Sequence, residues 1–211
     1  MKTILVFKIT AVLIFIMNSV NAQNKTNLEE IFSGGSIKSV TSDKGFFAED
    51  REGSTSLPCV TTKEVKNFKF GTVELTNGGE HGIDNIPYNK LSLLFSDKAH
   101  TKLVGLLLRI EKKSEAIAIG KYIASRYGKA KVLSPVPKPD ASGKILGYPA
   151  VSYVNTKTKQ SIIVADNYTV IDGKPSFSTD LFIVNNDVKV SDPGVDSTVA
   201  ERVIMTYKTI N

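Results

Sequence analysis

Residues 91–110 read LSLLFSDKAHTKLVGLLLRI, two apolar runs separated by a short polar stretch. The runs 91–95 and 103–110 have the length and the β-branched and leucine content of buried strands. Residues 96–101, Ser-Asp-Lys-Ala-His-Thr, have the composition of a turn. This part of the chain therefore predicts an antiparallel β-hairpin.

A helix is predicted directly after the hairpin. Small and apolar residues recur at steps of three and four between positions 116 and 127, which is the spacing of one helix face. Ser114 can cap its start, and Gly128 stands where a left-handed C-terminal cap is favoured. We expect a helix over about 114–127.

The same reasoning extends to both sides of this unit. Residues 68–75 alternate as a strand does, and the glycine-rich loop 76–82 follows. Prolines at 135, 137 and 139 mark a stiff surface connection, after which 148–154 and 161–166 predict a second hairpin and 181–184 a further strand. Valines four residues apart then predict a C-terminal helix over about 196–209, which Asp196 or Ser197 can cap.

Hairpins with two separate helices are typical of the α+β class. The sequence predicts an antiparallel sheet built from hairpins, with both helices packed on one of its faces. The order of elements resembles that of the PsbP-like sandwiches and of the tandem β-lactamase-inhibitor fold. This resemblance concerns element order alone and implies no role for any residue.

The N-terminal 22 residues have the pattern of a secretory signal peptide. Lys2 and Lys8 accompany a short apolar run, and Val20 and Ala22 fit the small-residue positions of a cleavage site after Ala22. Residues 23–64 contain few apolar residues and predict an irregular or flexible lead-in, and 65–211 predict a single domain. We expect a protein of the periplasm or the extracellular space, with no membrane span after cleavage.

Charge and cysteine content exclude several classes of protein. The net charge of +6 falls to +4 without Lys2 and Lys8, and the remaining basic residues form no run, so nucleic-acid binding is not expected. Cys59 is the single cysteine, which excludes a scaffold stapled by internal disulfides.

Cys59 is also the most reactive side chain. A catalytic thiol needs a histidine base, and the chain has two, His81 and His100. Three interpretations remain open: a buried inert thiol, which is favoured, an intermolecular disulfide, and a nucleophile.

Other candidate sites are weaker. Glu80, His81 and Asp84 form a polar cluster with metal-binding groups but without the ligand spacing of a metal site, so an exposed loop is favoured. The glycines of the same loop do not fit the dinucleotide or P-loop patterns, and no cofactor is predicted. Tyr148, Tyr153 and Tyr168 lie near loops and are candidate contact residues, although packing is the favoured role for each.

The sequence assembles no set of nucleophile, base and metal ligands. We therefore expect a non-catalytic binding or interaction module whose partner is a protein or small ligand of the cell envelope. Two alternatives are an envelope hydrolase that uses Cys59 with a histidine, and an assembly component that pairs through a sheet edge.

Overall fold

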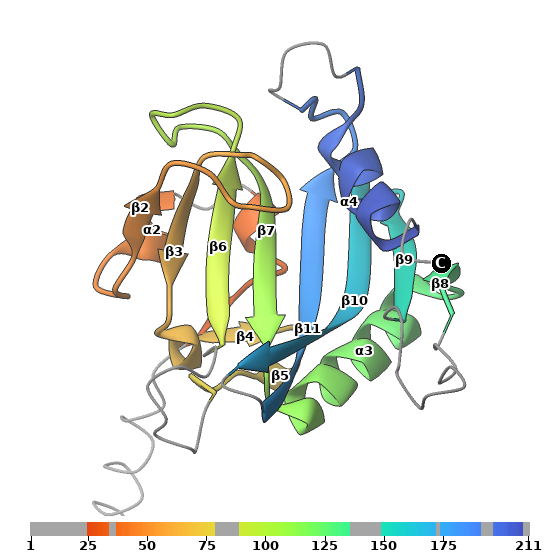
Figure 1. Ribbon diagram of the computed structural model, residues 1–211. Helices are drawn as coiled ribbons and strands as arrows, with labels where there is room; N and C mark the ends of the chain where they lie inside the picture. The colour runs from red at the N-terminus through yellow and green to blue at the C-terminus, as the bar shows by residue number, and fades with distance from the viewer. Residues whose placement is uncertain are drawn as a thin grey trace, which may run out of the picture.

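The computed structural model describes residues 25–33, 37–78, 89–135, 149–171, 174–190 and 196–208. An eight-stranded antiparallel sheet forms the centre of the fold, and a small three-stranded sheet lies beside it (Figure 1). The strands of the large sheet, in spatial order, are β2 (Phe47–Glu49), β3 (Cys59–Thr62), β6 (Lys90–Phe95), β7 (Leu103–Ile110), β11 (Lys174–Asn185), β10 (Gln160–Ile171), β9 (Ala150–Asn155) and β8 (Lys131–Ser134).

The predicted hairpin is the β6–β7 pair. Its register runs from Lys90 opposite Arg109 to Leu94 opposite Gly105, after which an irregularity shifts Phe95 to face Leu103. Gly105 is required by close packing, because a Cβ atom there would lie 2.8 Å from the carbonyl oxygen of Ile183 on β11. The second predicted hairpin is also present, as β9 with β10, and β10 also pairs with β11.

Pairing of β7 with β11 joins the two hairpin groups into one sheet. Leu181 lies opposite Leu108 and Ile183 opposite Leu106, so residues more than 70 positions apart form adjacent apolar rows. The predicted α+β fold with a large antiparallel sheet and two packed helices is confirmed.

The two long helices differ from the expectation in one respect: they pack on opposite faces of the sheet. Ile119 and Ile123 of α3 (Lys113–Tyr127) share an apolar cluster with Leu106 and Leu108. Val203 of α4 (Val199–Lys208) lies in the second cluster, whose sheet residues alternate with those of the first. The physical reason is that β6, β7, β10 and β11 are apolar at consecutive positions, so both faces of the sheet must be covered.

The helix ends also differ in detail. Lys112 is the N-cap of α3 and makes no side-chain capping bond, so the cap expected from Ser114 is not formed. Gly128 does end α3, with φ of 79° and its N–H bonded to the carbonyl of Ala124. At α4 the cap is Thr198 rather than Asp196 or Ser197, because Thr198 and Glu201 exchange side-chain to backbone hydrogen bonds in a capping box.

The segment expected to be a loose lead-in is folded wherever the structure describes it. Leu28 and Val40 are buried in the cluster under α3, and the Glu29 carboxylate accepts hydrogen bonds from the hydroxyls of Tyr122 (2.5 Å) and Tyr127 (2.8 Å). The N-terminal elements are β1 (Thr26–Asn27), the 3-10 helix η1 (Ile31–Ser33) and α2 (Ile37–Thr41), followed by β2 and β3 of the large sheet.

The small sheet completes this side of the molecule. Strand β1 runs parallel to β4 (Phe68–Phe70), which pairs with β5 (Val73–Glu74), and the 3-10 helix η2 (Val65–Asn67) precedes β4. Most of the proline-rich connection, together with the predicted signal peptide, lies outside the described residues. None of the described helices has the length and apolarity that crossing a bilayer requires.

Candidate functional site

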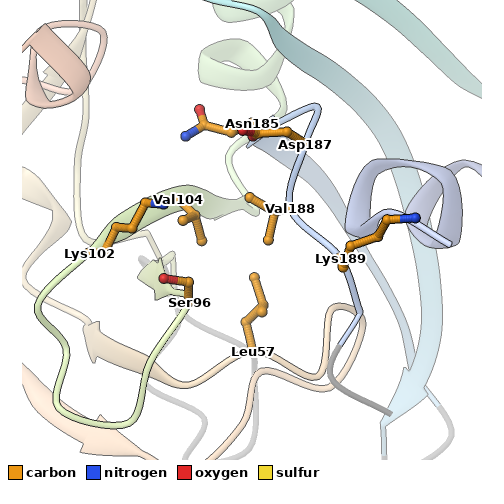
Figure 2. Close-up of a pocket in the computed structure, with 8 residues that line it drawn as sticks. All are labelled: Leu57, Ser96, Lys102, Val104, Asn185, Asp187, Val188 and Lys189. Carbon is orange, nitrogen blue, oxygen red and sulfur yellow. The ribbon is translucent and has the colours of Figure 1, made fainter. Parts of the chain in front are cut away.

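A pocket of about 330 Å³ opens at one end of the large sheet, beside the apolar cluster under α4. Three chain segments meet there: the loop before β3, the β6–β7 turn, and the chain that follows β11 (Figure 2). The lining residues are Leu57, Ser96, Lys102, Val104, Asn185, Asp187, Val188 and Lys189.

The inner part of the pocket is apolar. Leu57, Val104 and Val188 belong to or pack against the cluster that includes Phe182 and Val203. Figure 2 shows these three side chains pointing into the same space, from the loop before β3, from the start of β7 and from the chain that follows β11. Such a floor can hold the apolar part of a small molecule.

The loop that carries Leu57 is held in place by its own hydrogen bonds. The carboxylate of the buried residue Glu52 accepts from the backbone N–H groups of Ser54 (3.0 Å) and Thr55 (2.8 Å). Ser56 has a left-handed backbone with φ of 58°, and its N–H bonds to the carbonyl of Glu52. These bonds fix the turn that directs Leu57 towards the sheet.

The rim of the pocket is polar. On one side, Asp97 accepts from the N–H groups of Thr101 (3.1 Å) and Lys102 (3.0 Å), and these bonds hold the pKa of Asp97 below its usual value. The same bonds fix the backbone of the β6–β7 turn at Lys102, whose side chain lies beside Val104 in Figure 2. Asn185 and Asp187 stand together on another wall.

Lys189 contributes less charge to the pocket than its position suggests. Its amine lies 2.7 Å from Asp196, and this hydrogen bond raises the pKa of Lys189 above its usual value. Figure 2 shows the amine directed away from the pocket, towards the helix. Lys102 is therefore the rim cation that is positioned to meet a ligand.

Cys59 lies on the same face of the sheet but is buried away from the pocket lining. Its sulfur lies 3.7 Å from a carboxylate oxygen of Glu49 and 3.8 Å from the hydroxyl of Thr61. Burial raises the pKa of the thiol to about 11, which keeps it protonated at neutral pH. These surroundings favour the inert thiol among the three interpretations.

His100 does not lie where it could serve Cys59 as a base. Its ring packs on Phe95, at 5.0 Å between centroids, and Phe95 belongs to the cluster under α3 rather than to that of Cys59. His100 also has a left-handed backbone with φ of 54°, as a turn residue can.

The remaining predicted site residues are distributed as follows. Tyr153 is buried in the cluster under α3, in the packing role that was favoured. Tyr168 is part of β10, opposite Phe177 on β11. Glu80, His81, Asp84 and Tyr148 lie outside the described residues. Among the residues that are described, no three potential metal ligands come together.

An ion pair between a buried carboxylate and an arginine that is 36% exposed lies on the same face, and it is not anticipated from the sequence. Both Arg109 nitrogens that face Asp180 donate hydrogen bonds of 2.9 Å to it, and the Asn167 amide donates a third, of 2.6 Å. The Asp180 side chain is 2% exposed, and its carboxylate raises the pKa of Arg109. In the sequence, this ion pair is indicated only by Arg109, a charged residue within the apolar run 103–110.

Glu111 follows this ion pair at the end of β7. One of its carboxylate oxygens, Oε1, is buried and lacks a hydrogen-bond partner within the described structure. Desolvation raises the pKa of Glu111 to about 7, although the charge of Arg109 opposes this. The residue therefore carries a proton through part of the neutral range.

Comparison with known proteins yields no match: no protein family, no curated protein and no solved structure is significantly similar to this chain.

Proposed function

We propose that this chain is an exported binding protein that holds a small amphiphilic molecule in the pocket at the end of the large sheet. The observation that carries the proposal is the pocket itself, in which an apolar floor of Leu57, Val104 and Val188 lies beneath a polar rim. The buried, protonated thiol of Cys59, whose described neighbours are Glu49 and Thr61, favours binding over thiol catalysis.

The size and chemistry of the pocket define the ligand class. A space of about 330 Å³ lies at the small end of the range for ligand sites. The apolar floor accommodates a short hydrocarbon or ring system, and the rim offers the Lys102 ammonium to an anionic end group. Because Asp187 and Asn185 share the rim, a hydroxyl or amide on the ligand also has partners there.

Three probes with the same hydrocarbon tail test this assignment: octanoate, octanol and octylamine. The floor predicts saturable binding of octanoate, and Lys102 predicts that octanoate binds more tightly than octylamine. Binding is measured by isothermal calorimetry, or by the shift in melting temperature. Failure of all three probes to bind saturably would overturn the proposal.

A matched pair of variants locates the site. Val188→Phe fills the pocket and should abolish octanoate binding, whereas Val154→Phe makes the same change at a position on β9 that is 58% exposed and should leave binding unchanged. If Val188→Phe disturbs folding, Lys102→Met serves instead, with the exposed turn residue Lys98→Met as its control. Cys59→Ser should retain binding, which separates this proposal from a thiol enzyme.

Export rests on residues 1–22, whose pattern predicts a signal peptide. Mass spectrometry of the protein isolated from its source cells tests this part separately. The expected mature chain begins at Gln23, and a chain that retains residues 1–22 would contradict export by this route.

A further inference from the structure

The outer surface of α3 carries an unusual combination of charge and apolar exposure. Lys113, Ile117 and Lys121 are spaced four residues apart, so they lie on one side of the helix, and all three are exposed. Ile117 is 48% exposed between the two lysines. Because α3 buries Ile119 and Ile123 against the sheet, this side faces away from the core.

The same surface continues beyond the end of the helix onto β8. Lys129 is exposed, and Val132 is 62% exposed. Leu133 joins the cluster under α4, so the alternation along β8 places Val132 on the α3 side of the sheet. Figure 1 shows the C-terminal end of α3 leading directly into β8 at the edge of the sheet. We call the following set the α3 surface: Lys113, Ile117, Lys121, Lys129 and Val132.

No exposed acidic side chain within residues 112–132 neutralises the α3 surface. Glu115 is the single acidic residue between positions 112 and 132, and it is buried, where it accepts hydrogen bonds from Thr76 and Asn89. Throughout the described part of the chain, no ion pair involves any of the three lysines of the surface. Arg126, the arginine of α3, is instead directed to Glu29.

We propose that the α3 surface binds peripherally to membranes that contain anionic phospholipid. A lysine near such a surface gains on the order of 1 kcal/mol, so three lysines together can hold a folded protein at the headgroups. Ile117 and Val132 are positioned to enter the interfacial region, where burial of apolar area adds to the attraction. The surface uses lysine rather than arginine, and it offers point charges rather than a shaped site, which fits a fluid array of headgroups. It does not include any residue of the pocket, so this proposal does not depend on the proposed function.

The chain offers a direct optical test, because it contains no tryptophan. A chain that begins at Gln23 retains every described residue and omits the apolar N-terminal run, which would itself bind lipid. In this chain, Ile117→Trp should show a blue shift of its emission on addition of vesicles with equal parts of phosphatidylglycerol and phosphatidylcholine. Val154→Trp, an exposed site on the α4 side of the sheet, should not.

Two double variants test the contribution of the lysines with the same vesicles. Both lose the same net charge, so they differ only in the positions of the lost lysines. Lys113→Gln with Lys121→Gln should reduce co-sedimentation about tenfold or more, whereas Lys98→Gln with Lys157→Gln, at two exposed turn positions, should leave it close to the parent value. Equal loss in both pairs would mean that net charge alone drives binding and would overturn the proposal. Absence of binding to the anionic vesicles would also overturn it, as would equal binding to pure phosphatidylcholine. Binding to polyglutamate with no binding to vesicles would replace the membrane with an acidic protein partner.

Discussion

The two faces of the large sheet are covered to different degrees. The face under α3 is closed by the helix, by the small sheet and by the N-terminal segment, which Glu29 fixes through Tyr122 and Tyr127. In the described part of the chain, the face under α4 is covered by a shorter helix, by the loop that carries Leu57 and by the chain that follows β11. It contains the pocket, Cys59 and the Arg109–Asp180 ion pair. The proposed binding site therefore lies on the less completely covered face.

The largest effect is expected at the ion pair on the α4 side. Arg109→Met leaves the Asp180 carboxylate buried with Asn167 as its remaining described partner, which should lower the free energy of unfolding by about 3–5 kcal/mol. Lys90 lies opposite Arg109 in the register and pairs with Glu49, but both of those side chains are about one third exposed. Lys90→Met should therefore cost at most about 1 kcal/mol.

Urea unfolding of both variants checks this difference. Replacement of the pair as a unit, by Arg109→Met with Asp180→Leu, should recover most of the loss, because no buried charge is left unpaired. Similar losses of unfolding free energy in Arg109→Met and Lys90→Met would show that the burial of Asp180 does not increase the cost of removing its partner.

The next effect concerns packing on the α3 side. Ile123→Ala removes a side chain that is fully buried under α3 and should cost about 2–4 kcal/mol in equilibrium unfolding. Ile117→Ala makes the same change on the exposed side of the same helix and should change stability by no more than about 0.5 kcal/mol. A comparable cost at Ile117 would mean that this side of α3 is covered in solution, which would also contradict its proposed contact with lipid.

The smallest effect is a pH dependence at Glu111. Its pKa is about 7 in the folded protein against a usual value of 4.5, so the folded state binds the proton more tightly than the unfolded state does. The stability that this proton provides is complete below pH 4.5 and is lost as the pH rises through 7. Glu111→Gln should therefore stabilise the protein at pH 8 by about 1 kcal/mol, a value reduced for partial solvation of the side chain, and should have little effect at pH 4.

Unfolding curves of the parent and of Glu111→Gln at the two pH values make the measurement. Equal effects at pH 4 and pH 8 would contradict a raised pKa and would attribute the change to packing instead.

Local pattern predicted the parts of this fold that depend on neighbours in sequence. The β6–β7 hairpin and the helix that ends at Gly128 follow from runs, turns and caps that lie within a few residues of one another. The face on which α4 packs does not follow from local pattern. It depends on which side of β10 and β11 remains uncovered after α3 has packed.

The pocket and the ion pair could not be predicted from local sequence pattern for the same reason. Val104 and Val188 come together through the pairing of β7 with β11, and Arg109 meets Asp180 through the same register. Leu57 joins them through the pairing of β3 with β6. The low apolar content of residues 23–64 also misled, since a few residues such as Leu28 and Val40 are enough to fix a segment that packs on an existing core.

The most direct test of the account is a titration of the methyl-labelled protein with octanoate, followed by two-dimensional NMR. The account predicts saturable shifts that are concentrated at Leu57, Val104 and Val188, with the methyl groups of Ile119 and Ile123 unaffected. Shifts centred on the α3 side of the sheet, or spread without saturation over both faces, would contradict the claim that the α4 side carries the binding site.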